Sequence, residues 1–152
     1  MDRIKSSTEF IDLLHGSEPE EDIAALDAES LFTNAPVDET INLALTRIYH
    51  TDREPLPVSE RTLKSMLEAC TEEAPFLSHK GDLFRQCDGI AMESPLGVLF
   101  ANIYTDHVET TTFVSHQKPR IYARYIDDVF ITMKDKNEAT KLAVIFAFLS
   151  FN

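Results

Sequence analysis

The sequence predicts an α+β fold in which an antiparallel sheet carries helices on one face. Apolar residues recur at helical spacing over 37–49, which indicates a helix with one buried side. They alternate as in strands over 121–125 and 129–133. Gly81 follows a short apolar run and precedes another, which is typical of a hairpin turn.

The first half of the chain is expected to begin with a short amphipathic helix over 8–14. The small and branched residues of 23–26 then suit a buried strand that ends at Asp27. Residues 30–36 have the composition of a turn, and the helix of 37–49 follows it. Asp38 and Glu39 occupy the first turn of that helix, where acidic side chains complement the helix dipole.

The second half continues with a helix to about residue 70 that Ser59 caps. The hairpin joins 76–78 to 83–86. Pro95, a favoured first-turn residue, is expected to start a helix that runs to about residue 110. After the strands of 121–133, Asn137 starts a last helix rich in alanine, leucine, isoleucine and phenylalanine. Without its additional helices, this order corresponds to a split βαβ, or ferredoxin-like, arrangement.

Composition limits the classes of function. The chain has 152 residues, a length that suits one domain, and 26 acidic residues oppose 14 lysines and arginines, for a net charge of −12. Such a surface repels phosphate backbones, so any nucleic-acid function must rest on local features. No zinc-ligand spacing, phosphate-cradling glycine loop or nucleophile elbow is present.

The same composition predicts a compartment. No apolar run approaches the roughly 18 residues that a membrane helix needs, and the polar start carries no secretory signal region. Two cysteines are too few for a disulfide framework. We therefore expect an intracellular protein of the nucleus or cytoplasm, neither secreted nor bound to a membrane, whose oligomeric state stays open.

The segment from Arg124 to Phe130 carries the clearest chemistry. Asp127 and Asp128 are adjacent acids between strand-forming flanks, and their mutual repulsion costs stability unless a cation binds. Divalent cations such as Mg²⁺ prefer such oxygen ligands. Asp27 ends another strand; if the strands are neighbours, three carboxylates converge and could hold two cations for an in-line displacement. An Asp-Asp pair alone is weak evidence, because aspartate is common in turns.

Three segments, in order, carry a family resemblance. Residues 26–36, Leu-Asp-Ala-Glu-Ser-Leu-Phe-Thr-Asn-Ala-Pro, resemble the first catalytic motif of the reverse transcriptases of Penelope-like retroelements. Residues 88–97, Asp-Gly-Ile-Ala-Met-Glu-Ser-Pro-Leu-Gly, with 101–104 after them, are similar to that family's second palm motif. Residues 124–128 resemble the Tyr-x-Asp-Asp box of reverse transcriptases. The resemblance covers residues 23 to about 135 and implies a reverse-transcriptase palm.

The resemblance implies a role for each matching residue. The catalytic acids would be Asp27, Asp127 and Asp128, and with the carbonyl of Ala28 they would hold two Mg²⁺ or Mn²⁺ ions. Nucleotide-binding positions would be Phe32, as the steric gate against a ribose 2′-hydroxyl, with Gly89, Ser94 and Pro95. Tyr125 and Arg124 would contact the primer–template duplex. From the residues alone, Phe32 is better explained as a core aromatic that follows a strand, and Tyr125 can be explained as a half-buried strand residue with its hydroxyl in water.

A set of basic residues interleaved with aromatic ones is open to two interpretations. It is either a remnant of a primer–template surface or scattered surface charge. Its members are Lys80, Phe84, Arg85, Lys118, Arg120, Tyr122 and Arg124.

The resemblance also implies the domain plan. Residues 1–22 would be an N-terminal helical segment, the remnant of a fingers–palm junction. Residues 23–152 would be the palm, truncated at the C-terminus because the chain ends within an apolar stretch. Glu93 stands where this family has glycine, and only Arg3 and Lys5 supply positive charge before Asp27.

Two functions follow from these expectations. The first is a palm fragment of a retroelement RNA-directed DNA polymerase, acting on an RNA template, a DNA primer and deoxynucleoside triphosphates. The missing fingers and thumb predict weak or no activity for the isolated chain. The alternative is a catalytically inactive retroelement-derived fragment or interaction module. A nucleotidyl cyclase would share the metal geometry, but it would leave Ser94 to Gly97 and the Tyr125 box without an explanation.

Overall fold

The computed structural model describes most of the chain in two compact units. The described residues are 2–15, 22–27, 31–52, 54, 56–71, 75–85, 89–91, 94–115, 118–133 and 135–149, and the side chains of Asp2, Asp22, Asp27 and 145–149 lie outside the description. One unit comprises Met1–Glu29 with Val108–Asn152, and the other comprises Ser30–His107. Helix α5 (Gly97–Ser115) contributes to both units. Each unit is considered by itself.

The first unit contains a four-stranded sheet. Its strands are β1 (Asp2–Arg3), β2 (Asp22–Asp27), β5 (Ile121–Tyr125) and β6 (Asp128–Met133), in the spatial order β1-β5-β6-β2. Strands β2 and β5 both pair with β6 in the antiparallel sense, as predicted. Strand β1 pairs with β5 in the parallel sense, so the sheet is mixed. A strand of two residues is too short to show a period, and the sequence did not predict it.

The pairing of β2 with β6 fixes which residues of the two strands face each other. Six pairs run from Asp22 opposite Met133 to Asp27 opposite Asp128. The sequence predicted a buried strand over 23–26, but none of these four side chains is buried and Ile23 is 68% exposed; β2 is an edge strand of the sheet. A slip by one residue would exchange the two faces of β2. On β6 the buried face consists of Val129, Ile131 and Met133.

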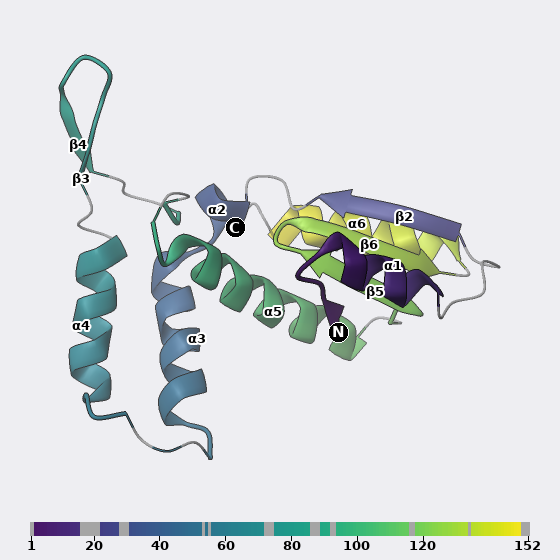
Figure 1. The fold of residues 1–152 in the computed structure, drawn as a ribbon, viewed down its shortest axis with the longest axis horizontal. Helices are drawn as coiled ribbons and strands as arrows, with labels where there is room; N and C mark the ends of the chain where they lie inside the picture. Colours follow the sequence, from purple (N-terminus) through teal and green to yellow (C-terminus); the bar gives the residue numbers. More distant parts are fainter. Residues whose placement is uncertain are drawn as a thin grey trace. The chain divides into compact units, whose positions relative to one another are not determined.

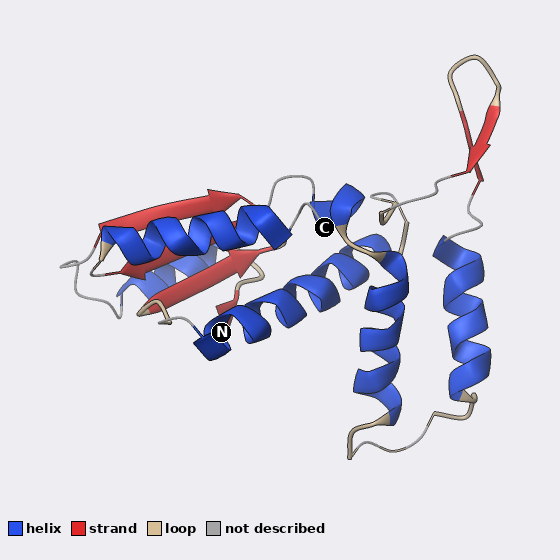
Figure 2. Cartoon of the chain, turned by 180° about the vertical axis from the view of Figure 1, so that it is seen from behind, coloured by secondary structure: helices blue, strands red, loops and turns tan. Residues whose placement is uncertain are grey.

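Helices cover both faces of this sheet, not only one as predicted (Figures 1 and 2). Helix α6 (Lys136–Leu149) lies against β2 and β6, with Leu142 buried. Helix α1 (Ser7–His15) lies on the opposite face, where the ring of Phe10 meets that of Phe130 edge-on at 5.0 Å between centroids. Successive strand residues point to opposite faces, so Phe130 faces away from its buried neighbours Val129 and Ile131. The apolar side of α1 therefore covers the face of the sheet opposite to α6.

The second unit is mainly helical. It holds α2 (Leu31–Asn34), α3 (Val37–Tyr49), α4 (Glu60–Thr71) and the first part of α5. Helix α3 has the predicted bounds, and it buries one side, formed by Thr40, Ile41, Ala44 and Leu45. Arg47 of α3 forms an ion pair with Asp106 of α5 at 3.0 Å. Helix α4 packs beside α3.

The starts of three helices can be compared with the predicted ones. Ser59 caps α4 as predicted, because its Oγ accepts the backbone N–H of Thr62 at 3.2 Å. Helix α2 replaces part of the predicted turn. Helix α5 begins at Gly97 and not at Pro95, because a turn precedes it: the N–H of Gly97 donates to the carbonyl of Ser94 at 2.8 Å.

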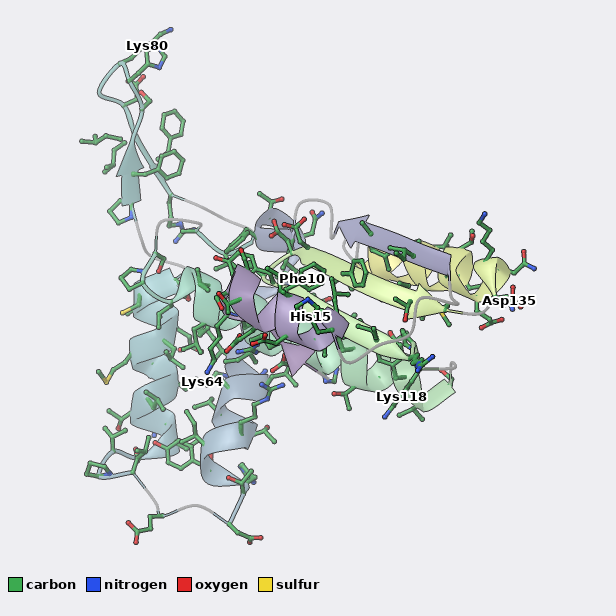
Figure 3. All side chains as sticks on the ribbon, turned by 45° about the vertical axis from the view of Figure 1, so that its right-hand side comes forward. Phe10, His15, Lys64, Lys80, Lys118 and Asp135 are labelled. Carbon is green, nitrogen blue, oxygen red and sulfur yellow. The ribbon has the colours of Figure 1, made fainter. Side chains whose placement is uncertain are left out.

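The predicted hairpin of β3 (Pro75–Leu77) and β4 (Leu83–Arg85) is confirmed, with Gly81 in its turn at φ +87°. Every residue of both strands is exposed. The rings of Phe76 and Phe84 stack at 5.8 Å, and Lys80 lies at the tip (Figure 3). None of the helices that the structure describes is long and apolar enough to cross a membrane.

Gly89 occupies a position that only glycine fits. Its φ is +73°, a region that L side chains rarely adopt. A Cβ there would lie 2.4 Å from the carbonyl oxygen of Thr33 and 2.7 Å from that of Phe32. The next residue, Ile90, donates its backbone N–H to the Phe32 carbonyl. Two of the three motifs that carry the resemblance therefore meet in this unit.

Replacing Gly89 by alanine is expected to destabilise the protein by more than the about 1 kcal/mol that a positive φ alone costs a non-glycine residue. The additional loss comes from the contact of the new Cβ with two backbone carbonyls. Gly81→Ala is the matched control, since its φ is also positive but no atom lies within 4 Å of the added Cβ. Urea denaturation measures both variants, and equal losses of unfolding free energy would contradict the close approach at Gly89.

Candidate functional site

The three predicted catalytic acids lie at one end of the sheet in the first unit. Asp27 ends β2 and is the register partner of Asp128, the first residue of β6. On its other side, Asp128 pairs with Tyr125, the last residue of β5. Asp127 lies in the two-residue turn between β5 and β6. The backbone therefore brings together positions that are a hundred residues apart in the sequence.

The side chains at this end of the sheet have the donor chemistry of a magnesium site. Asp127 is half-buried and Asp128 is exposed, so both carboxylates have access to solvent. Carboxylate oxygens are the ligands that Mg²⁺ prefers. Among the side chains that the structure describes, no three His, Cys, Asp or Glu residues form a group that could hold a metal. The side chain of Asp27 and all of Ala28 lie outside that description, and their roles as ligands stay a prediction.

The turn that carries Asp127 has a strained backbone. Ile126 has a φ of +56°, and it is the only non-glycine residue in the described part of the chain with a positive φ. A two-residue hairpin turn with positive φ at its first central position is of the type II′ kind, which favours glycine there. A left-handed conformation costs an L-residue roughly 1–2 kcal/mol. Such strain persists only where the surroundings over-determine the conformation.

A buried ion pair adjoins this turn. Arg124 of β5 is 1% exposed and Glu109 of α5 is 3% exposed. The Nε of Arg124 donates to Oε1 of Glu109, and the hydroxyl of Tyr122 donates to the same oxygen at 2.6 Å. The Nη1 of Arg124 donates to the backbone carbonyl of Ile126 at 3.1 Å. One guanidinium group therefore bonds both to α5 and to the turn.

Tyr122 is held neutral by this environment. Burial is the main cause that raises its pKa above the ordinary 10.0, and the neighbouring Glu109 carboxylate, which accepts its hydroxyl proton, raises the pKa further. The positive charge of Arg124 acts in the opposite direction but does not cancel these effects. The ring of Phe113 packs edge-on against that of Tyr122, with 5.5 Å between centroids. The hydroxyl therefore keeps its proton and donates it in the hydrogen bond to Glu109.

The two residues expected at the primer–template surface differ in exposure. Tyr125 is 49% exposed and pairs with Asp128 in the sheet. Arg124 is buried and bonded internally, so its position favours a structural role over a contact with nucleic acid. Strand alternation places successive side chains on opposite faces, which explains why these neighbours differ.

The predicted nucleotide-binding residues belong to the second unit. Phe32 is half-buried, and its backbone carbonyl lies against Gly89. Ser94 accepts the N–H of Leu96 through its Oγ at 3.3 Å, which supports the turn before α5. Pro95 is exposed. Glu93, the departure from the family's glycine, lies outside the described residues.

Two of the interleaved basic and aromatic residues do not lie at the surface. Tyr122 and Arg124 are buried in the first unit, where they bond to Glu109. Lys80 and Phe84 are exposed on the hairpin of the second unit. Glu109 is the residue that the sequence analysis missed. Its only signal is that Tyr122 and Arg124 alternate with apolar residues on one strand and therefore share a buried face that needs an acidic partner.

The raised pKa of Tyr122 predicts a loss of stability in alkali. Above about pH 10 the unfolded chain releases the phenol proton while the folded protein keeps it, so the free energy of unfolding falls as the pH rises. Urea denaturation at increasing pH measures this slope, and phenolate absorbance reports ionisation directly. Tyr122→Phe should show a shallower slope. An unchanged slope in that variant would contradict the assignment.

Comparison with known proteins supports the fold. No protein-family model and no curated protein matches the sequence. The structure is similar to that of apo telomerase from Candida tropicalis (TM-score 0.71, 14% identity, covering 93% of this chain and 28% of that chain). It is also similar to a form of that telomerase truncated from the C-terminal domain (0.68, 14%, 95% and 32%).

A third similar structure is telomerase from Candida albicans in complex with a TWJ fragment of telomeric RNA (TM-score 0.69, 11% identity, covering 94% of this chain and 28% of that chain). The chain thus spans about a third or less of the length of these telomerases. At identities this low the likeness concerns the fold alone. The chain has a fold of the reverse-transcriptase type, like that of part of telomerase.

Proposed function

We propose that this chain is the palm part of an RNA-directed DNA polymerase from a Penelope-like retroelement, with Asp27, Asp127 and Asp128 as the acids of a two-metal nucleotidyl-transfer site. The observation that carries the proposal is the register that pairs Asp27 with Asp128 beside the turn of Asp127. The likeness to telomerase supports it, because that polymerase contains the same fold. The three motifs in order support the retroelement origin.

Each residue near the acids has a part in this proposal. Two bound divalent cations would supply activation of the primer 3′-hydroxyl and neutralisation of charge on the leaving pyrophosphate. Asp27 and Asp127 would hold both cations, with Asp128 as the supporting acid and the carbonyl of Ala28 as a further ligand. Tyr125, half exposed next to Asp128, would contact the primer end. Phosphoryl transfer depends mainly on such positioning and on charge neutralisation.

The second unit would supply the nucleotide-binding residues. The contact of Gly89 with the backbone of Phe32 supports a common surface for the two motifs. Phe32 would exclude ribonucleotides, while Gly89, Ser94 and Pro95 would support the template base and the incoming deoxynucleoside triphosphate. An RNA template with a DNA primer is the proposed substrate, and the RNA in one telomerase structure is consistent with it. Such a reaction would take place in the nucleus or cytoplasm.

A second candidate function has its own support. The net charge of −12 opposes binding to phosphate backbones, and Glu93 adds negative charge where the family has glycine. Both observations favour a catalytically inactive retroelement-derived fragment or interaction module. Tight, sequence-independent binding to a primer–template duplex at moderate salt would argue against this second candidate.

Primer extension on an RNA template with a DNA primer tests the leading proposal. We expect weak deoxynucleotide incorporation by the wild-type chain with Mg²⁺ or Mn²⁺, since the chain lacks fingers and thumb, and loss of that incorporation in Asp127→Asn, because the change removes a carboxylate ligand without a change in size. Asp82→Asn, at the exposed turn of the hairpin, is the matched control and should retain incorporation.

Two results would count against catalysis. Equal incorporation by Asp127→Asn and the wild type would show that the acidic turn does not carry the reaction. No incorporation by the wild type with either cation would leave the non-catalytic module as the better account.

A further inference from the structure

We propose that Arg124 and Glu109 are positioning residues for the acidic turn, which they hold in the conformation that a metal site requires. The proposal rests on the function proposed above and assigns the buried ion pair of the first unit to it. Neither residue would touch substrate or metal. Arg124 would act through the carbonyl of Ile126, and Glu109 would act through Arg124.

The bond from Arg124 to the turn restrains Asp127 directly. The carbonyl that accepts Nη1 belongs to the peptide plane between Ile126 and Asp127. Because that plane is rigid, a fixed carbonyl also fixes the N–H group and the N–Cα bond of Asp127, and so restricts where its side chain begins. Ile126 holds a positive φ that its branched side chain disfavours, so without this restraint the turn would relax toward an ordinary conformation.

Glu109 determines where the guanidinium group points. Its Oε1 binds the Nε of Arg124, and a guanidinium is planar, so a fixed Nε leaves little freedom for Nη1. The hydroxyl of Tyr122 donates to the same carboxylate at 2.6 Å and holds it in place. The side chains of Tyr122, Glu109 and Arg124 therefore form a chain of hydrogen bonds that ends at the turn and fixes the orientation of its Ile126 carbonyl. Hydrogen bonds that orient metal ligands in this way are a general feature of metal sites.

The position of Arg124 explains why a lysine would not replace it. An ammonium group on a flexible stem can retain the charge pair with Glu109, but it lacks the planar fork that serves both partners at once. Arg124→Lys therefore keeps the charge pair with Glu109 but removes the hydrogen bond that positions the turn. Glu109→Gln provides a second variant with nearly unchanged shape, in which the carboxylate charge is lost.

The experiment measures Mn²⁺ binding by electron paramagnetic resonance and amide hydrogen exchange at Asp127 and Asp128. We expect Arg124→Lys to weaken Mn²⁺ binding about ten-fold or more and to speed exchange at the turn, because the Ile126 carbonyl loses its donor. Glu109→Gln should change both readouts in the same direction. Phe113→Leu is the matched control: Phe113 lies on the same helix as Glu109 and packs on Tyr122, and its side chain has no hydrogen-bonding group. It should lower stability and leave Mn²⁺ affinity unchanged.

The outcomes separate this inference from the proposed function. Asp127→Asn reports whether bound Mn²⁺ occupies the acidic turn. If that variant loses binding while Arg124→Lys and Glu109→Gln match the wild type, the positioning inference is overturned and the metal site stands. If the wild type and Asp127→Asn bind alike, the metal site is refuted. In that case only hydrogen exchange at the turn tests the positioning inference. Exchange that is unchanged in both Arg124→Lys and Glu109→Gln would overturn it.

Discussion

The structure depends above all on the antiparallel ladder between β2 and β6. Its six pairs place a buried apolar face of β6 against α6 and, in the same register, set Asp27 opposite Asp128. A shift of one residue would exchange the two faces of β2 and move Asp27 from its place opposite Asp128. The backbone pairing of the two strands therefore determines where the strand ends that carry these acids lie.

The buried ion pair of Arg124 and Glu109 stabilises the turn between β5 and β6. A chain with a net charge of −12 places one of its few arginines, 1% exposed, directly behind its acidic turn. Removal of charge from water is costly, and Glu109 with the Tyr122 hydroxyl compensates for that cost. The same guanidinium therefore stabilises the core and the strained turn of Ile126.

The sequence predicted elements with a strong local signal and missed those that depend on distant partners. Helix α3 matched its prediction because its apolar period is regular, and the hairpin matched because Gly81 specifies the turn. Strand β1 was missed because its two residues exist as a strand only through β5. The prediction that all helices lie on one face of the sheet was wrong. The spacing of apolar residues shows that α1 has a buried side, but it does not show which face of the sheet that side covers.

For the site, the sequence could place Asp27 and Asp128 only at strand ends, and their pairing depends on the two strands being neighbours. Glu109 was not predicted, because no local pattern in α5 marks it as the partner of Arg124. The most direct test of the account is anomalous diffraction from crystals of this chain grown with Mn²⁺. The account predicts an anomalous peak ligated by the carboxylates of Asp27, Asp127 and Asp128. A peak elsewhere, or an Asp27 side chain directed away from the β5–β6 turn with Mn²⁺ present, would contradict it.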